Sequence, residues 1–89
     1  MRTVKITRDR ESIERFKRNY GETGLPDELE TIVCQFAWDG LELISVKAKG
    51  KQGETLDYTR FDNESFRHLV KSCYFLAKWA RDDTTRRGA

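Results

Sequence analysis

The sequence is poor in residues that bind metals or perform catalysis. Among 89 residues it has one histidine, His68, and two cysteines, Cys34 and Cys73. A structural zinc site needs four converging ligands at a recognisable spacing, so we expect no metal and no cofactor. A cysteine nucleophile needs a nearby base and an accessible setting, whereas both cysteines fall among apolar neighbours. We therefore expect no catalysis and no small-molecule substrate.

Long hydrophobic runs are missing as well. No stretch approaches the roughly 18 apolar residues that a membrane-spanning helix needs, and residues 1–6 lack the hydrophobic region of a secretory signal. We therefore expect no membrane contact and a cytoplasmic location. In that compartment Cys34 and Cys73 are expected to stay reduced.

The chain does contain much charge and enough aromatic material for a core. Hydrophobic residues make up 37% and charged residues 36%, with five Phe, three Tyr and two Trp. A chain of this length forms one domain. We expect that domain to cover residues 1–81 and the polar residues 82–89 to form a disordered tail. The net charge is only +2, but residues 21–46 contain acids and no lysine or arginine.

The first third of the chain predicts a strand, a short helix and a loop. Apolar and polar residues alternate over residues 2–7, and the basic residues among them favour a position at the edge of a sheet. Asp9 can cap a helix over residues 10–20, and Gly21 can end it. We expect residues 21–30 to form a loop.

The middle of the chain predicts three antiparallel strands, over residues 31–38, 41–48 and 54–61. Asp39-Gly40 lies between two apolar runs, which is typical of a two-residue hairpin because both central residues need positive φ. Such a turn pairs Trp38 with Leu41, Phe36 with Leu43, Gln35 with Ile44, Cys34 with Ser45, Val33 with Val46 and Ile32 with Lys47. The third strand would then pair Tyr58 with Ile44, Leu56 with Val46 and Arg60 with Glu42.

This register predicts a sheet that is partly apolar on both faces. One face carries Val33, Ile44, Val46, Leu56 and Tyr58. The other carries Ile32, Cys34, Phe36, Trp38, Leu41, Leu43 and Phe61. An antiparallel sheet with one wet face normally alternates cleanly between apolar and polar residues, so both faces of this sheet are expected to make contacts.

The last predicted helix, residues 64–81, carries two apolar stripes. Asp62 or Asn63 can cap its start. The first stripe has the spacing that buries one helical face, and it consists of Phe66, Leu69, Val70, Cys73, Leu76, Ala77 and Ala80. Phe75 and Trp79 lie four residues apart and project from roughly the opposite side. This second stripe needs a cover, which is the first helix, a second copy of the chain or a ligand.

Together these elements predict an α+β fold, a two-layer sandwich in which an antiparallel sheet of three to four strands packs against two helices. The element order is β-α-β-β-β-α. From Arg10 to Arg81 this order is similar to that of double-stranded RNA-binding domains, which read the shape of A-form RNA. That family carries lysines at the start of its last helix, where this chain reads Asp62-Asn63-Glu64-Ser65-Phe66-Arg67. The strand-then-helix end is also similar in layout to small single-strand-binding coactivator proteins.

Two functions remain open, and the first is protein–protein interaction. Apolar character on two sides of a short chain is typical of an interface. The partner would be a second copy of the chain, giving a homodimer, or another protein that the module binds or inhibits. The candidate interface residues are Phe36, Trp38, Leu41, Leu43, Phe75 and Trp79.

The second function is nucleic-acid binding by basic side chains interleaved with aromatic ones. Stacking on aromatic rings combined with phosphate neutralisation is the mode of sequence-tolerant binders. The candidate residues for this alternative are Lys47, Lys49, Lys51, Arg67, Lys71, Lys78 and Arg81.

Overall fold

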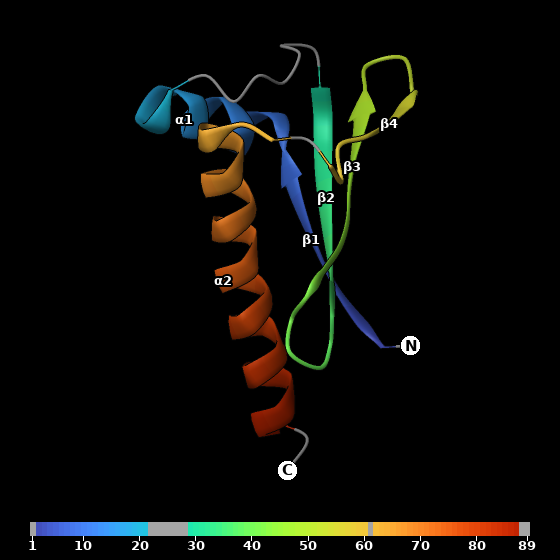
Figure 1. Ribbon diagram of the computed structural model, residues 1–89, viewed down its shortest axis with the longest axis vertical. Coiled ribbons are helices and arrows are strands. Elements are labelled where there is room, and N and C mark those ends of the chain that lie inside the picture. Colours follow the sequence, from blue (N-terminus) through green and yellow to red (C-terminus); the bar gives the residue numbers. More distant parts are fainter. Residues whose placement is uncertain (1, 22–28, 61, 88–89) are drawn as a thin grey trace.

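The computed structural model describes residues 2–21, 29–60 and 62–87, and it confirms the predicted α+β architecture. The elements are β1 (Thr3–Asp9), α1 (Arg10–Tyr20), β2 (Leu29–Ala37), β3 (Leu43–Gly50), β4 (Thr55–Asp57) and α2 (Glu64–Arg87). The four strands form one open antiparallel sheet in the order β1-β2-β3-β4. Both helices lie on one side of this sheet (Figure 1). Most of the predicted loop, at residues 22–28, and Phe61 lie outside the described residues.

The predicted bounds of α1 are confirmed, because short-range signals define both of its ends. The Asp9 carboxylate accepts a hydrogen bond from the backbone N–H of Ser12 at 2.9 Å, which satisfies a free donor of the first turn. At the other end Gly21, with φ of 93°, donates its backbone N–H to the carbonyl of Lys17. The helix buries Ile13 and Phe16 against the sheet.

The turn between β2 and β3 is wider than the predicted two-residue hairpin. The backbone N–H of Ala37 donates to the carbonyl of Glu42 at 2.8 Å, so four residues form the loop. Gly40 and Leu41 are the loop residues with positive φ, at 76° and 51°. The predicted pairing of Trp38 with Leu41 is therefore wrong.

A bulge then shifts the predicted register of β2 and β3 by one residue. The predicted pair Phe36–Leu43 is confirmed, but the next pair joins Gln35 to Ser45 and leaves Ile44 as the extra residue. A shift of one residue moves every later side chain of a strand to the opposite face. The observed pairs are Cys34–Val46, Val33–Lys47 and Ile32–Ala48, in place of the predicted Cys34–Ser45, Val33–Val46 and Ile32–Lys47.

The shift changes which residues are buried. Val46 and Ala48 enter the core beside Ile32 and Cys34, whereas Ile44, the extra residue of the bulge, is exposed. The two faces therefore differ clearly: one is apolar and covered by the helices, and the other is polar. The prediction of two partly apolar faces was wrong because an unbulged hairpin placed Val46 on the wrong face.

β4 is much shorter than the predicted strand over residues 54–61. It pairs Leu56 with Ala48, not with Val46 as predicted, and ladder pairing ends at Asp57. Beyond that point the hydroxyl of Thr59 accepts a hydrogen bond from the backbone N–H of Val46 at 3.0 Å. A side chain thus satisfies a strand donor that a longer β4 would otherwise have satisfied.

α2 begins where predicted and continues six residues past the predicted end at Arg81. Asn63 caps it, since its side-chain carbonyl accepts from the backbone N–H of Phe66 at 3.1 Å. Residues 82–87, expected as part of a disordered tail, are helical. No glycine or proline occurs between Glu64 and Arg87, and Asp82 precedes Arg86 by four residues, a spacing that favours a helix.

The core lies between the sheet and the two helices. Its buried residues are Val4, Ile13, Phe16, Leu29, Ile32, Cys34, Phe36, Leu41, Val46, Ala48, Phe66, Leu69, Cys73 and Ala77. From the predicted stripe of the last helix, Val70 and Ala80 are partly buried and Leu76 is exposed. Within the described ranges, neither helix combines the length and the apolar character needed to cross a membrane.

Candidate interaction surfaces

The outward side of α2 carries a ridge of two exposed aromatic side chains between two opposite charges. Phe75 is 56% exposed and Trp79 is 68% exposed. Lys71 precedes Phe75 by four residues and Asp83 follows Trp79 by four, so all four side chains belong to one i, i+4 row of the helix. We call Lys71, Phe75, Trp79 and Asp83 the outer ridge.

α1 covers only the start of this surface. The ring of Tyr20 stacks on His68 with centroids 6.1 Å apart, and the Ser65 hydroxyl donates to the carbonyl of Tyr20 at 3.2 Å. In Figure 1, α1 lies beside the first turns of α2, and the later turns extend away from it. The first helix was one of three expected covers for Phe75 and Trp79, and it does not bury either of them.

A shallow pocket marks the place where α1 ends against α2. Its volume is about 200 Å³, below the roughly 300 Å³ at which small-molecule sites begin. The pocket is lined by Phe16, Tyr20, His68, Lys71, Ser72 and Phe75. The hollow is therefore smaller than the sites that normally hold a small molecule.

The predicted interface cluster at the β2–β3 hairpin is not a surface. Phe36 and Leu41 are buried in the core, so their assignment as interface residues was wrong. Trp38 is partly buried: the guanidinium of Arg2 lies 3.6 Å from its ring centroid. Its backbone N–H donates to the carbonyl of Arg2 at 3.0 Å, and its carbonyl accepts from Arg81 at 3.4 Å. Leu43, the fourth residue of the cluster, pairs with Phe36 as predicted and is exposed.

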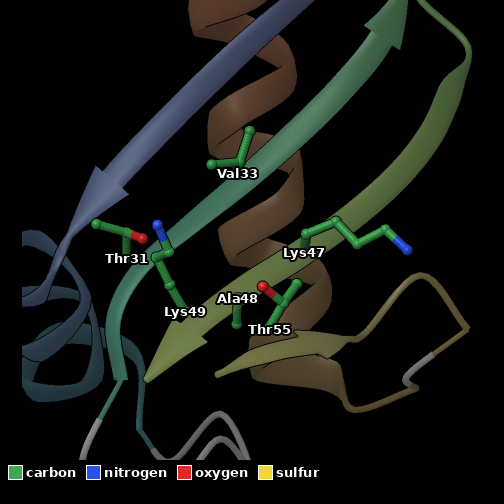
Figure 2. A pocket seen from close by; sticks show the side chains of 6 residues that line it. All are labelled: Thr31, Val33, Lys47, Ala48, Lys49 and Thr55. Atoms are coloured by element: carbon green, nitrogen blue, oxygen red, sulfur yellow. The ribbon is translucent and has the colours of Figure 1, made fainter. Parts of the chain in front are cut away.

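The face of the sheet that is turned away from the helices is polar and has no cover in the described structure. We call it the outer sheet face; it carries Thr3, Lys5, Thr7, Thr31, Val33, Gln35, Ser45, Lys47, Lys49, Thr55 and Asp57. Figure 2 shows part of it, where Lys47 and Lys49 of β3 lie around a hollow of about 210 Å³ with Thr31, Val33 and Thr55. The arrangement offers ammonium and hydroxyl groups to a partner.

The charge of this face is partly neutralised within the protein. The ammonium of Lys47 lies 2.9 Å from the carboxylate of Asp57. Hydrogen bonds from Thr59 and Lys47 hold the pKa of Asp57 below its ordinary value of 3.8, so this carboxylate is charged at neutral pH. Lys5 and Lys49 are exposed on the same face.

The predicted basic residues do not form one surface. Lys47 and Lys49 lie on the outer sheet face, Lys51 lies in the following turn, and Lys71 and Lys78 lie on α2. The remaining two predicted cations, Arg67 and Arg81, each pair with a carboxylate of this chain. Arg67 pairs with Asp62 at 3.0 Å, while Arg81 pairs with Asp82 and bonds the carbonyl of Trp38. Of the seven predicted cations, Lys71 lies on the outer ridge, and Lys78 lies about two turns further along α2.

The cysteines lie in the core, away from both surfaces. Cys34 and Cys73 are both free thiols and fully buried, and they lie close enough to shift each other's pKa. The neighbouring Cys73 thiol and burial raise the pKa of the Cys34 thiol, which stays protonated. In the part of the chain that the structure describes, no three His, Cys, Asp or Glu side chains gather into a group that could hold a metal ion.

No protein-family model, curated protein or solved structure matches this chain. The surfaces must therefore be interpreted from their own chemistry. Sequence reasoning did not find Asp83, because residues 82–89 were assigned to a tail. The signal that could have identified it is the four-residue spacing Lys71, Phe75, Trp79, Asp83, with no helix-breaking residue among them.

Proposed function

We propose that this chain is a small non-catalytic binding module that acts through protein–protein contact at the outer ridge of α2. The observation that carries this proposal is the exposure of Phe75 and Trp79 side by side on a regular helix. Aromatic residues are enriched at interfaces and provide most of their hot spots. Leu76, also exposed, extends the apolar area toward the core.

The chemistry of the described residues supports a binding role over a catalytic one. His68, the only histidine of the sequence, stacks on Tyr20, and both thiols are buried. A catalytic site needs a nucleophile or a general base that reaches a substrate. The outer ridge instead offers two rings, one ammonium and one carboxylate on a rigid helix, which is the composition of a contact surface.

A photo-crosslinking residue tests the proposal directly. We would place p-benzoylphenylalanine at position 79 in living cells, and at position 51 as the control. Lys51 is exposed in the turn after β3, away from the outer ridge. We expect protein adducts from position 79 that are absent or much weaker from position 51. Equal or absent adducts at the two positions would refute the proposal.

Nucleic-acid binding is the second candidate, and the lysines of the outer sheet face favour it. Lys5, Lys47 and Lys49 lie on one uncovered face beside threonine hydroxyls, a set that can contact phosphates. The described part of this face carries no aromatic ring for base stacking, so any binding would rest on the phosphate backbone.

Salt dependence tests this second candidate. Affinity for a nucleic acid should fall with a log–log slope near −1 per phosphate neutralised. Lys49→Glu should weaken binding and reduce the slope by about one, whereas Arg18→Glu, at an exposed residue of α1 outside the seven candidates, is the matched control. Affinity that does not respond to salt would eliminate this candidate.

A further inference from the structure

The outer ridge is complementary to itself when one copy is reversed. Along α2 it runs from the cation Lys71 through Phe75 and Trp79 to the anion Asp83, and each member follows the previous one by four positions. Its midpoint falls at the level of Ala77, which lies on the buried side of the helix. Each member therefore has a counterpart at an equal distance on the other side of the midpoint.

We propose, resting on the function proposed above, that the partner at this surface is a second copy of the same chain. The two α2 helices pack antiparallel about a two-fold axis at the level of Ala77. In that arrangement Phe75 of one protomer faces Trp79 of its partner, and Lys71 of one protomer faces Asp83 of its partner. Each of these pairs occurs twice, as an isologous dimer requires.

Electrostatics selects the antiparallel arrangement over the parallel one. Two copies aligned in the same direction would place Lys71 against Lys71 and Asp83 against Asp83, which is repulsive at both ends. The reversed copy turns both ends into attraction, and such complementarity specifies orientation and register. The aromatic pairs lie between the charged pairs, so stacking and burial act at the centre and ion pairing at the rim.

The geometry of α2 permits this packing. The ridge is an i, i+4 row, and two such rows interdigitate when the helix axes cross at about −50°. In Figure 1 the later turns of α2 have no helix beside them, so a second helix can approach there. Near Lys71 the partner's Asp83 would meet the pocket that includes Tyr20 and His68.

The size of the ridge predicts a weak dimer. An aromatic side chain buries about 150–250 Å², and four rings that are each partly covered contribute less than about 1,000 Å² in total. That area lies below the roughly 1,200–2,000 Å² of stable specific interfaces and is typical of weak, transient ones. We therefore expect monomer and dimer to exchange, with a dissociation constant in the micromolar range.

Sedimentation velocity over a range of protein concentrations is the first test. The wild-type chain should pass from monomer to dimer as the concentration rises from about 1 to 500 µM, around the expected dissociation constant. Trp79→Ala, which removes an exposed ring and leaves the core untouched, should remain monomeric over the same range. A wild-type chain that stays monomeric throughout, or a Trp79→Ala dimer of unchanged affinity, would overturn the proposal.

Two charge reversals test the register. Lys71→Glu and Asp83→Lys each place like charges together in the homodimer, so each variant alone should dimerise about tenfold more weakly or worse at low salt. Mixed together, the two variants restore both attractive pairs in a heterodimer. We expect the mixture to associate more tightly than either variant alone, and Lys51→Glu to behave as the wild type.

The outcomes separate this inference from the proposed function. A mixture no tighter than its components would overturn the antiparallel register. Adducts at position 79 that contain a different protein, together with a wild-type chain that stays monomeric, would leave the proposed function standing and refute the second copy as the partner. Adducts of twice the mass of the chain would support both.

Discussion

Cys34 of β2 and Cys73 of α2 lie thiol to thiol in the core, and neither side chain has any exposed surface. The pair joins the sheet to the helix at the level where Ile32, Val46 and Leu69 are also fully buried. Their position links the reactivity of the thiols to the opening of the fold, because a reagent reaches them only when α2 separates from the sheet.

We predict that neither thiol reacts rapidly with a disulfide reagent in the folded protein. The thiolate is the reactive form, and both cysteines are fully buried, so a reagent cannot reach either sulfur in the folded state. Labelling should accelerate with added urea, in parallel with unfolding. Lys51→Cys, which adds an exposed thiol, should react at once with one equivalent. Rapid labelling of the native wild type would show that the core opens readily.

Leu69→Ala should destabilise the protein strongly and Leu76→Ala should not. Leu69 is 0% exposed, and its truncation leaves a cavity that costs about 2–5 kcal/mol. Leu76 lies on the same helix but is 41% exposed, so its truncation should cost less than about 1 kcal/mol. Urea unfolding measures both values. Equal losses of unfolding free energy in the two variants would mean that α2 packs a different face against the sheet.

Gly40→Ala tests the geometry of the β2–β3 turn. Gly40 has φ of 76°, and a Cβ at this position would meet no other atom within 4 Å, so the cost comes from the backbone alone. A non-glycine residue in this region costs about 1–2 kcal/mol. The neighbouring Asp39→Ala, at a residue without positive φ, should change the unfolding free energy by less than about 0.5 kcal/mol. An unfolding free energy that Gly40→Ala leaves unchanged would contradict the positive φ at this position.

Acid should weaken the β3–β4 pairing through Asp57. Its folded pKa is depressed below 3.8 by Thr59 and Lys47. The stabilisation is therefore present above the unfolded pKa and is lost as the pH falls through the lower folded pKa. Asp57→Asn should be less stable at pH 7 and decline less steeply in acid, so the two melting curves should converge at low pH. Asp39→Asn controls for the loss of a carboxylate. Parallel curves for wild type and Asp57→Asn would refute this role.

The structural elements and both helix starts were predictable, because the signals that specify them are local. Asp9 and Asn63 cap helices by bonding backbone groups three residues away, and Gly21 ends α1 with a positive φ. These interactions need only neighbours in the chain. The spacing of Phe66, Leu69, Cys73 and Ala77 likewise identified the buried face of α2.

The register of the hairpin was not predictable in the same way. Apolar residues at both Leu43 and Ile44 fit either of two alternations, and the local pattern does not choose between them. The bulge at Ile44 buries Val46 and Ala48 under α2, a helix that follows about 20 residues later. Packing against a distant element therefore decided the register, and with it the burial of Val46 and Ala48.

The candidate site shows the same division. The sequence by itself determined that Phe75 and Trp79 lie together on a helix, apart from the stripe that faces the core, since this follows from 3.6 residues per turn. Only the tertiary structure decided that α1 ends beside His68, that Phe36 and Leu41 fill the core, and that Lys47 and Lys49 point away from the aromatic ridge. The periodicity of one helix is a property of its own backbone, whereas its covering depends on the length and packing of every other element.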